Sequence, residues 1–193
     1  MPRDLIIFGP PGAGKGTQAP RIAAELGVPH VSTGDMLRHH RREGTDLGRE
    51  AQAYMDRGDL VPDDLVVRML RARIEEPDAR EGFVLDGFPR TVPQAAALDV
   101  MLAEAGRDIE RLLVLDVSEE EIVQRISSRV GDDGKRRPDD EPEVVRNRYA
   151  VYLAETVPVR DHYRDRRTPE SVVRGTGSLD EVYGRLRDAL GLA

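Results

Sequence analysis

Residues 5–17 read Leu-Ile-Ile-Phe-Gly-Pro-Pro-Gly-Ala-Gly-Lys-Gly-Thr, and this stretch decides the fold. The apolar run 5–8 predicts a short buried strand, and the glycine-rich loop after it leads directly into a helix-like segment. Glycines reach backbone conformations that other residues avoid, so successive N–H groups of such a loop can point into one hollow. Together with the positive end of the following helix and the ammonium of Lys15, the loop predicts a site for the phosphates of a nucleoside triphosphate.

One position departs from the general pattern of such phosphate-binding loops. That pattern places Ser or Thr directly after the lysine to hold Mg²⁺, whereas this chain has Gly16 there, followed by Thr17. An ordinary glycine-rich turn between a strand and a helix is the alternative interpretation. The loop by itself also leaves the class of protein open, because GTPases, ATPases and small-molecule kinases share it.

The composition fits one globular domain and argues against several classes of protein. The chain has 193 residues, of which 39% are hydrophobic and 34% are charged. Its formal net charge of −7 argues against a general nucleic-acid binder, which needs an excess of lysine and arginine. The absence of cysteine excludes disulfides and cysteine-ligated zinc, and it fits a reducing, cytoplasmic location. No apolar run has the length of a membrane span, and we expect no signal peptide in residues 1–10.

Short apolar segments alternate with helix-like segments along the chain. The expected strands are 5–8, 30–33, 83–86, 112–117 and 171–173. The expected helices are 15–26, 34–42, 46–56, 63–74, 92–105, 119–129, 142–164 and 179–190. This alternation predicts an α/β fold of the P-loop NTPase type, in which a five-stranded parallel sheet carries helices on both faces. Ligands of such sheets bind beyond the carboxyl ends of the strands.

Two segments go beyond what is needed to connect the strands of such a sheet. Residues 34–82 separate the second and third expected strands, which predicts a small helical subdomain inserted at the edge of the site. Residues 130–136, Val-Gly-Asp-Asp-Gly-Lys-Arg, predict a short, polar and exposed loop between two helices.

Further motifs follow the expected strands or lie on these two excursions. They are Ser32-Thr-Gly-Asp-Met-Leu-Arg38, Gly87-Phe-Pro-Arg90 with Asp86 before it and Gln94 after it, Arg137-Pro-Asp-Asp140, and Arg146-Asn-Arg148. With the glycine-rich loop, this set resembles the adenylate kinase family over essentially the whole chain, in order. The resemblance also accounts for Gly16, because that family has Gly-Lys-Gly-Thr in this loop.

The resemblance implies a reversible transfer of the terminal phosphoryl group of Mg-ATP to AMP, which gives two molecules of ADP. The implied partners are ATP, AMP and ADP, with Mg²⁺ carried on ATP, no zinc, no nucleic acid and no membrane, and the implied state is a monomer. The phosphate oxygen of AMP is already ionised near neutral pH, so the reaction needs no general base. This fits the four histidines, which show no pattern of metal ligands or of a catalytic triad.

The resemblance assigns one set of residues to the ATP side. These residues are Gly12, Ala13, Gly14, Lys15, Gly16, Thr17, Arg125, Arg129 and Gly177. Lys15 is expected on the β- and γ-phosphates, and the adenine of ATP is expected near Gly177. For Arg125, a solvated helix face is the alternative interpretation.

A second set is assigned to the AMP side. These residues are Thr33, Arg38, Asp59, Leu60, Val61, Gly87, Phe88, Pro89, Arg90, Gln94, Arg137 and Arg148. Arg38 and Arg90 are expected to grip the AMP phosphate, because planar guanidinium groups bond phosphate in pairs. Thr33 and Gln94 are expected to read the adenine edge, and the resemblance implies a cis peptide before Pro89. The residues expected to act as catalytic groups are Lys15, Arg90, Arg129, Arg137 and Arg148.

The resemblance also implies a division of the chain and a place for the metal. The core is expected in 1–31, 62–128 and 140–193, the AMP-binding subdomain in 32–61 and a short lid in 129–139. Asp86 is expected to hold Mg²⁺ through a metal-bound water, with no direct protein ligand. Asp139 and Asp140 are expected to pair with arginines, or else to be solvated acids at a helix N-terminus.

Three alternatives compete with this interpretation. A UMP/CMP kinase shares the phosphate-binding loop and Gly-Phe-Pro-Arg, although Thr33 and Gln94 favour adenine. A GTPase-type switch protein needs an Asn-Lys-x-Asp motif, which the chain lacks. A catalytically silent nucleotide-binding protein is disfavoured because no catalytic position is replaced.

Overall fold

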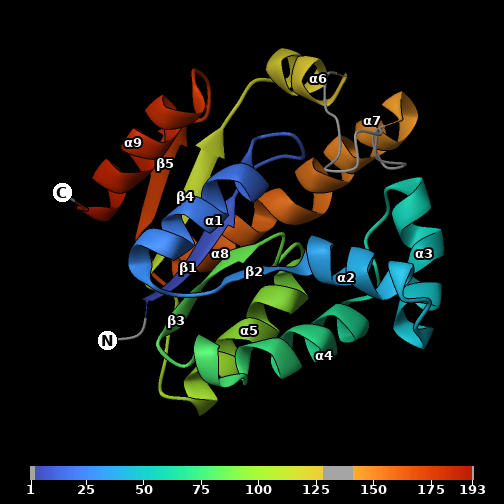
Figure 1. Ribbon diagram of the computed structural model, residues 1–193, viewed down its shortest axis with the longest axis horizontal. Coiled ribbons are helices and arrows are strands. Elements are labelled where there is room, and N and C mark those ends of the chain that lie inside the picture. The colour runs from blue at the N-terminus through green and yellow to red at the C-terminus, as the bar shows by residue number, and fades with distance from the viewer. Residues whose placement is uncertain (1–2, 128–140, 193) are drawn as a thin grey trace.

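A parallel sheet forms the centre of the computed structural model, which describes residues 3–127 and 141–192. Its strands are β1 (Arg3–Phe8), β2 (His30–Ser32), β3 (Gly82–Asp86), β4 (Arg111–Asp116) and β5 (Glu170–Arg174). All pair in parallel, in the order β2-β3-β1-β4-β5 (Figure 1). The predicted α/β fold with a five-stranded parallel sheet is therefore confirmed.

The central strand β1 is buried on both of its faces. Ile6 pairs in register with Leu85 of β3 on one side and with Leu112 of β4 on the other. Leu5, Ile6 and Ile7 are at most 1% exposed. A strand covered on both faces is apolar at every position rather than at alternate ones, which is why the sequence shows a continuous run here.

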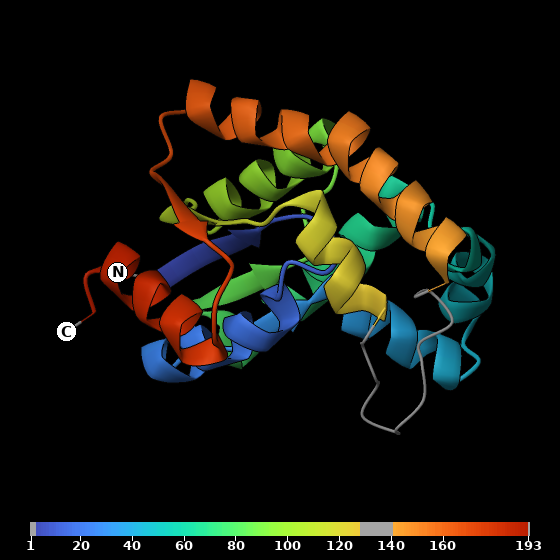
Figure 2. The ribbon, with the colours of Figure 1, turned by 90° about the horizontal axis from the view of Figure 1, so that it is seen from above.

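Helices cover both faces of the sheet (Figure 2). Helices α1 (Lys15–Leu26) and α9 (Leu179–Leu190) pack on the face to which Leu5 and Ile7 contribute. Helices α4 (Asp63–Ile74), α5 (Val92–Glu104) and α8 (Val157–Asp165) pack on the face to which Ile6 and Phe8 contribute. Side chains alternate between the faces of a strand, so β1 supplies both cores.

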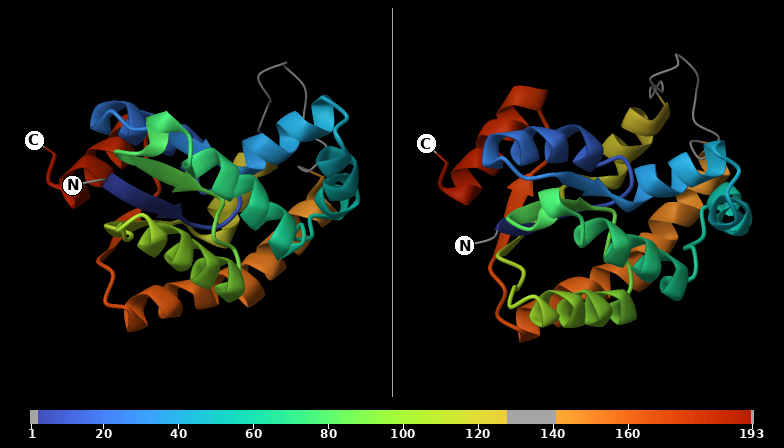
Figure 3. Two further views of the ribbon diagram at one scale, coloured as in Figure 1. Left: turned by 90° about the horizontal axis from the view of Figure 1, so that it is seen from below. Right: turned by 60° about the horizontal axis from the view of Figure 1, so that its bottom comes forward.

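The segment after β2 leaves the sheet as two packed helices, α2 (Thr33–Arg42) and α3 (Asp46–Arg57). Figure 3 shows them at the end of the molecule opposite the two termini, beyond the carboxyl ends of the strands. The helical insertion expected within 34–82 is therefore present at the predicted edge. No helix in the described ranges has the length and apolar character needed to cross a membrane.

Some predicted boundaries are wrong for identifiable reasons. The strand predicted over 30–33 ends at Ser32, because the Ser32 hydroxyl accepts a hydrogen bond from the Asp35 N–H at 3.3 Å and so caps α2, which begins at Thr33. The helix predicted over 142–164 consists of α7 (Pro142–Val151), the π-helical turn η3 (Tyr152–Thr156) and α8. Pro158, in the first turn of α8, has no N–H to donate to the preceding turn, which favours the wider turn there.

Two further elements complete the description. A 3₁₀ turn, η1 (Pro77–Ala79), precedes β3 and was not expected from the sequence. Helix α6 (Glu119–Ser127) begins where it was predicted, and the last two residues of the prediction lie outside the described residues.

Candidate active site

The glycine-rich loop joins β1 to α1 at the carboxyl edge of the sheet. Gly12 and Gly14 have φ angles of 83° and 95°, which glycine adopts without a steric penalty. Helix α1 follows directly, and within the described residues no side chain caps it, so N–H groups of its first turn are available to an anion. The Nζ of Lys15 donates to the carbonyl oxygens of Gly9 at 2.7 Å and Pro10 at 3.0 Å, so the ammonium lies against this loop.

Arg125 joins the loop to a segment far away in the sequence. Its guanidinium donates to the carbonyl oxygens of Ala13 at 3.3 Å and Gly175 at 2.8 Å, while Glu121 accepts from its Nε at 2.8 Å. Gly175 belongs to the loop between β5 and α9, where Gly177 has a φ of 109°. Arg125 therefore contacts both loops and does not lie on a wholly solvated helix face.

An open cleft of about 1990 Å³, called here the donor cleft, lies over the glycine-rich loop. Its lining includes the residues predicted for the ATP side that the structure describes, namely Gly12, Ala13, Gly14, Lys15, Gly16, Thr17, Arg125 and Gly177. Asp86, Arg90 and Arg148 also line it. Arginine and lysine side chains together with helix N–H groups suit a polyanionic ligand.

The surroundings of Asp86, at the end of β3, favour the ionised form of its carboxylate. Burial by itself raises the pKa of Asp86, but His30, Lys15 and Arg90 outweigh it and hold the pKa below its usual value. The His30 Nε2 lies 3.5 Å from Oδ2 of Asp86, which is an electrostatic contact rather than a well-formed hydrogen bond. A Cβ atom on Gly16 would come within 3.6 Å of the same oxygen, so the carboxylate faces the loop.

An ionised carboxylate at this position fits the predicted role toward Mg²⁺. It can accept hydrogen bonds from water on a metal ion that the ligand's phosphates carry, which is how Mg²⁺ is commonly bound. In residues 3–127 and 141–192, no group of three or more histidines, aspartates and glutamates is arranged to hold a metal ion directly.

A second hollow of about 600 Å³, the acceptor hollow, lies beneath α2 and α3 and is open to solvent. The predicted AMP-side residues that line it are Thr33, Arg38, Asp59, Leu60, Val61, Gly87, Arg90, Gln94 and Arg148. Apolar side chains that the sequence did not single out, Leu37, Met55 and Val66, line it too. An apolar wall with a few polar groups suits a base and its ribose phosphate.

The polar groups of this hollow are oriented by hydrogen bonds. The Thr33 hydroxyl donates to the Gly87 carbonyl at 2.9 Å, so it offers only lone pairs to a ligand. The Arg38 guanidinium pairs with the Asp35 carboxylate. Burial by itself raises the pKa of Asp35, but its bonds from Arg38 and Ser32 hold the pKa below its usual value.

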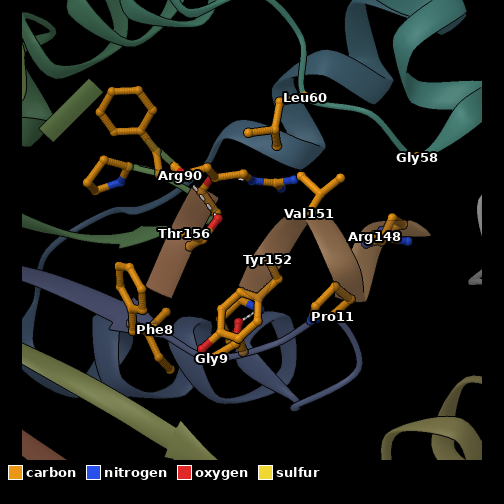
Figure 4. Close-up of a pocket in the computed structure, with 15 residues that line it drawn as sticks. Phe8, Gly9, Pro11, Gly58, Leu60, Arg90, Arg148, Val151, Tyr152 and Thr156 are labelled. Atoms are coloured by element: carbon orange, nitrogen blue, oxygen red, sulfur yellow. Dashed lines mark hydrogen bonds between the residues drawn. The ribbon is translucent and has the colours of Figure 1, made fainter. Parts of the chain in front are cut away.

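A third hollow of about 550 Å³, the middle hollow (Figure 4), shares lining residues with the other two. Phe88 and Pro89, which are linked by a cis peptide as the resemblance implies, line it together with Tyr152 and Thr156. Gly87, Arg90 and Arg148 line all three hollows. The two arginines, from the β3–α5 loop and from α7, therefore stand where the donor cleft and the acceptor hollow meet.

Several polar residues beside the site were not found from the sequence. Asp63 and Thr91 bond Gln94, and the Thr156 hydroxyl donates to the carbonyl of Arg90 at 2.9 Å. The Asn147 amide donates to the Arg57 carbonyl at 2.8 Å and to the Asp59 carboxylate at 2.9 Å, and so joins α7 to the end of α3. Thr91 carries a local signal as the N-cap of α5, and Asn147 lies inside the motif Arg146-Asn-Arg148, to which the sequence assigned no role for the amide.

Part of the predicted site lies outside the described residues. This concerns Arg129, Arg137, the acids Asp139 and Asp140, and the lid predicted over 129–139.

Comparison with known proteins places this geometry in a family. Residues 7–168 match the family model described as adenylate kinase. Proteins named "Adenylate kinase" are similar over almost the whole chain: that of Nocardia farcinica is 49% identical and that of Mycolicibacterium smegmatis 47% identical, each over 97% of this chain and 98% of the relative. That of Stenotrophomonas maltophilia is 47% identical over 96% of this chain and 98% of the relative. The chain belongs to the adenylate kinase family.

Proposed function

We propose that this chain is an ATP:AMP phosphotransferase, which reversibly moves the terminal phosphoryl group of Mg-ATP to AMP and yields two ADP. The observation that carries the proposal is the meeting of the donor cleft and the acceptor hollow at Arg90 and Arg148. A hydrolase needs one phosphate site and water, whereas two adjoining hollows with shared arginines suit transfer between two anions. The role in the cell would be adenine nucleotide homeostasis and salvage, in a cytoplasmic monomer.

The mechanism rests on positioning and on charge. The N–H groups of the glycine-rich loop and the Lys15 ammonium would hold the β- and γ-phosphates of ATP. Arg38 and Arg90 would hold the phosphate of AMP, whose ionised oxygen is the nucleophile. Arg90 and Arg148 would offset the charge that accumulates on the transferring group, and they would reduce the repulsion between the two nucleotides.

Mg²⁺ bound to ATP would neutralise phosphate charge and fix the geometry of the leaving group. Asp86 would orient it through metal-bound water, because its carboxylate is ionised and faces the loop. The donor base would lie beside Gly177, which lines the donor cleft, and Arg125 would hold the two loops that border it. Residues 32–61 would form the AMP-binding subdomain.

The test is ADP formation from Mg-ATP with AMP, UMP, CMP or GMP as the acceptor, against a reaction without acceptor. Transfer to AMP alone is the expected result. A preference for UMP or CMP would show that the acceptor is a pyrimidine nucleotide and not AMP. ADP formation without any acceptor would refute transfer altogether.

Two variants test the site residues. Lys15→Ala and Arg90→Ala should each lose at least about a hundredfold in turnover, the usual cost of removing one group that stabilises a transition state. The control is Arg68→Ala, because this arginine on α4 is 74% exposed and is not among the residues that line the three hollows. Unchanged turnover in either variant would remove that residue from the mechanism.

A further inference from the structure

Asp63, the first residue of α4, binds the start of α5 through both of its carboxylate oxygens. Its Oδ2 accepts from the Thr91 hydroxyl at 2.8 Å, and its Oδ1 accepts from Nε2 of Gln94 at 2.7 Å. Helices α4 and α5 lie side by side on the same face of the sheet (Figure 1). Two members of the network are shielded from water, since Thr91 is 8% exposed and Gln94 is 2% exposed, while Asp63 is partly buried.

These bonds give the Gln94 amide a single orientation. Its Oε1 accepts from the backbone N–H of Arg90 at 2.8 Å, and its Nε2 faces the carboxylate of Asp63. Rotation of the amide by 180° would set its oxygen against a carboxylate and its NH₂ against an N–H, and both contacts would be repulsive. An ionised carboxylate is only an acceptor, so it enforces this choice more strongly than a hydroxyl would.

Thr91 keeps the carboxylate in place. Its hydroxyl accepts from the backbone N–H of Gln94 at 3.2 Å, so its proton is left for Asp63. The same residue is the N-cap of α5, whose position is therefore linked to the orientation of the amide. Asp63 thus holds Gln94 in two ways: it binds the side-chain amide directly, and it binds the Thr91 hydroxyl that accepts from the Gln94 backbone N–H.

The oriented amide has a defined pattern to offer a ligand. Within the described residues, its bonds use one of its two N–H groups and one of its two oxygen lone pairs. One N–H donor and one oxygen lone pair of the amide remain for the acceptor hollow, which Gln94 lines. The 6-amino edge of adenine presents the complementary pair, N1 as acceptor and N6–H as donor, whereas the 6-oxo edge of hypoxanthine presents the reverse.

We infer that Asp63 is a specificity-determining positioning residue: it fixes the Gln94 amide so that the acceptor hollow takes a 6-amino purine nucleoside monophosphate and rejects its 6-oxo analogue. The inference rests on the proposed function, since it concerns the acceptor of that reaction. Asp63 touches no reacting atom and acts only through Gln94. A site with a fixed donor and acceptor discriminates strongly, because the wrong edge leaves buried polar groups unpaired.

The test compares AMP and IMP, which differ at position 6 of the base and in the protonation of N1. The ratio of their kcat/KM values is measured for the wild type, Asp63→Ala, Asp63→Asn and Asp64→Ala. Asp63→Ala should lower the AMP-to-IMP ratio by about tenfold, the equivalent of one buried hydrogen bond to a charged group, through a higher KM for AMP. The KM for ATP should not change.

Two variants separate orientation from other effects. Asp63→Asn should retain the wild-type ratio, because its Oδ1 can accept from Gln94 while its NH₂ donates to the Thr91 hydroxyl. Asp64→Ala removes the neighbouring carboxylate of the same first helical turn, which is 77% exposed, and should change neither KM value. Both variants, Asp63→Asn and Asp64→Ala, remove a negative charge at the N-terminus of α4 and so control for that loss.

The outcomes distinguish this inference from the proposed function. Wild-type protein that forms no ADP with AMP would overturn both. A wild type that uses AMP and IMP equally well would overturn the inference without any variant, so the test holds even where Asp63→Ala does not fold. An unchanged ratio in Asp63→Ala, or an Asp63→Asn variant as impaired as Asp63→Ala, would overturn the inference alone.

Discussion

Gly58 ends α3 at the point where this helix meets α7, and its replacement by alanine tests that contact. The residue has φ 76° and ψ 15°, in the left-handed region. An added Cβ would lie 2.9 Å from Cγ of Arg148 and 2.9 Å from the backbone oxygen of Val144. The side chain can yield, but the helix backbone cannot yield without moving α7.

The expected cost has two parts. A non-glycine residue in the left-handed region lowers the free energy of unfolding by about 1–2 kcal/mol. Alanine also reduces the entropy of the unfolded chain, which offsets about 0.4–1 kcal/mol of this cost. Forcing a methyl group into packed atoms costs typically about 1–3 kcal/mol more. Gly58→Ala should therefore lower the free energy of unfolding by about 1–4 kcal/mol.

Gly27→Ala is the matched control. Gly27 also ends a helix, with φ 69° and ψ 28°, but a Cβ there would meet nothing within 4 Å. It should lose about 1 kcal/mol or less, since only the backbone part applies. Urea unfolding measures both losses. Gly58→Ala should also lower kcat/KM for AMP, because Arg148 is displaced. Equal losses in the two variants, with activity unchanged, would refute the close-contact argument.

Two further predictions concern stability. Glu170 accepts hydrogen bonds from Arg160 at 2.6 Å and from Arg164 at 3.1 Å. Burial by itself raises the pKa of Glu170, but the two arginines hold this pKa below the usual value of 4.5. The stability that the ionised carboxylate contributes is therefore present above pH 4.5 and is lost as the pH falls through the folded-state pKa. Glu170→Gln should thus be about 1 kcal/mol less stable than the wild type in urea unfolding at pH 7, and the difference should shrink at pH 3; a pH-independent difference would contradict this. The Tyr163 hydroxyl is buried without a hydrogen-bond partner among the described residues, so Tyr163→Phe should unfold at the same or a higher temperature, and a clear loss of stability would contradict that expectation.

The parts of the molecule that could be predicted from the sequence are those encoded by neighbouring residues. The glycine-rich loop occupies one contiguous stretch, and β1, β3 and β4 each contain a continuous apolar run, so local patterns predict these elements. The predicted strand includes Thr33, although Ser32 and Asp35 are spaced as an N-cap and its partner, which is a local signal for a helix that begins at Thr33. The contacts of Asp63 with Thr91 and Gln94 span 28 and 31 residues, and they exist only because α4 and α5 pack together.

The position of Arg90 shows how such distant contacts form the site. Its backbone N–H is held by Gln94 and its carbonyl by Thr156, which belongs to the π-helical turn before α8. Because both anchors bind the main chain, an alanine at position 90 can keep them. It loses the bond from Nε of Arg90 to the Gly87 carbonyl, but that carbonyl also accepts from the Thr33 hydroxyl. The fold should therefore tolerate the loss of this guanidinium, and a fall in turnover in Arg90→Ala can be assigned to the missing charge between the two hollows rather than to a displaced loop.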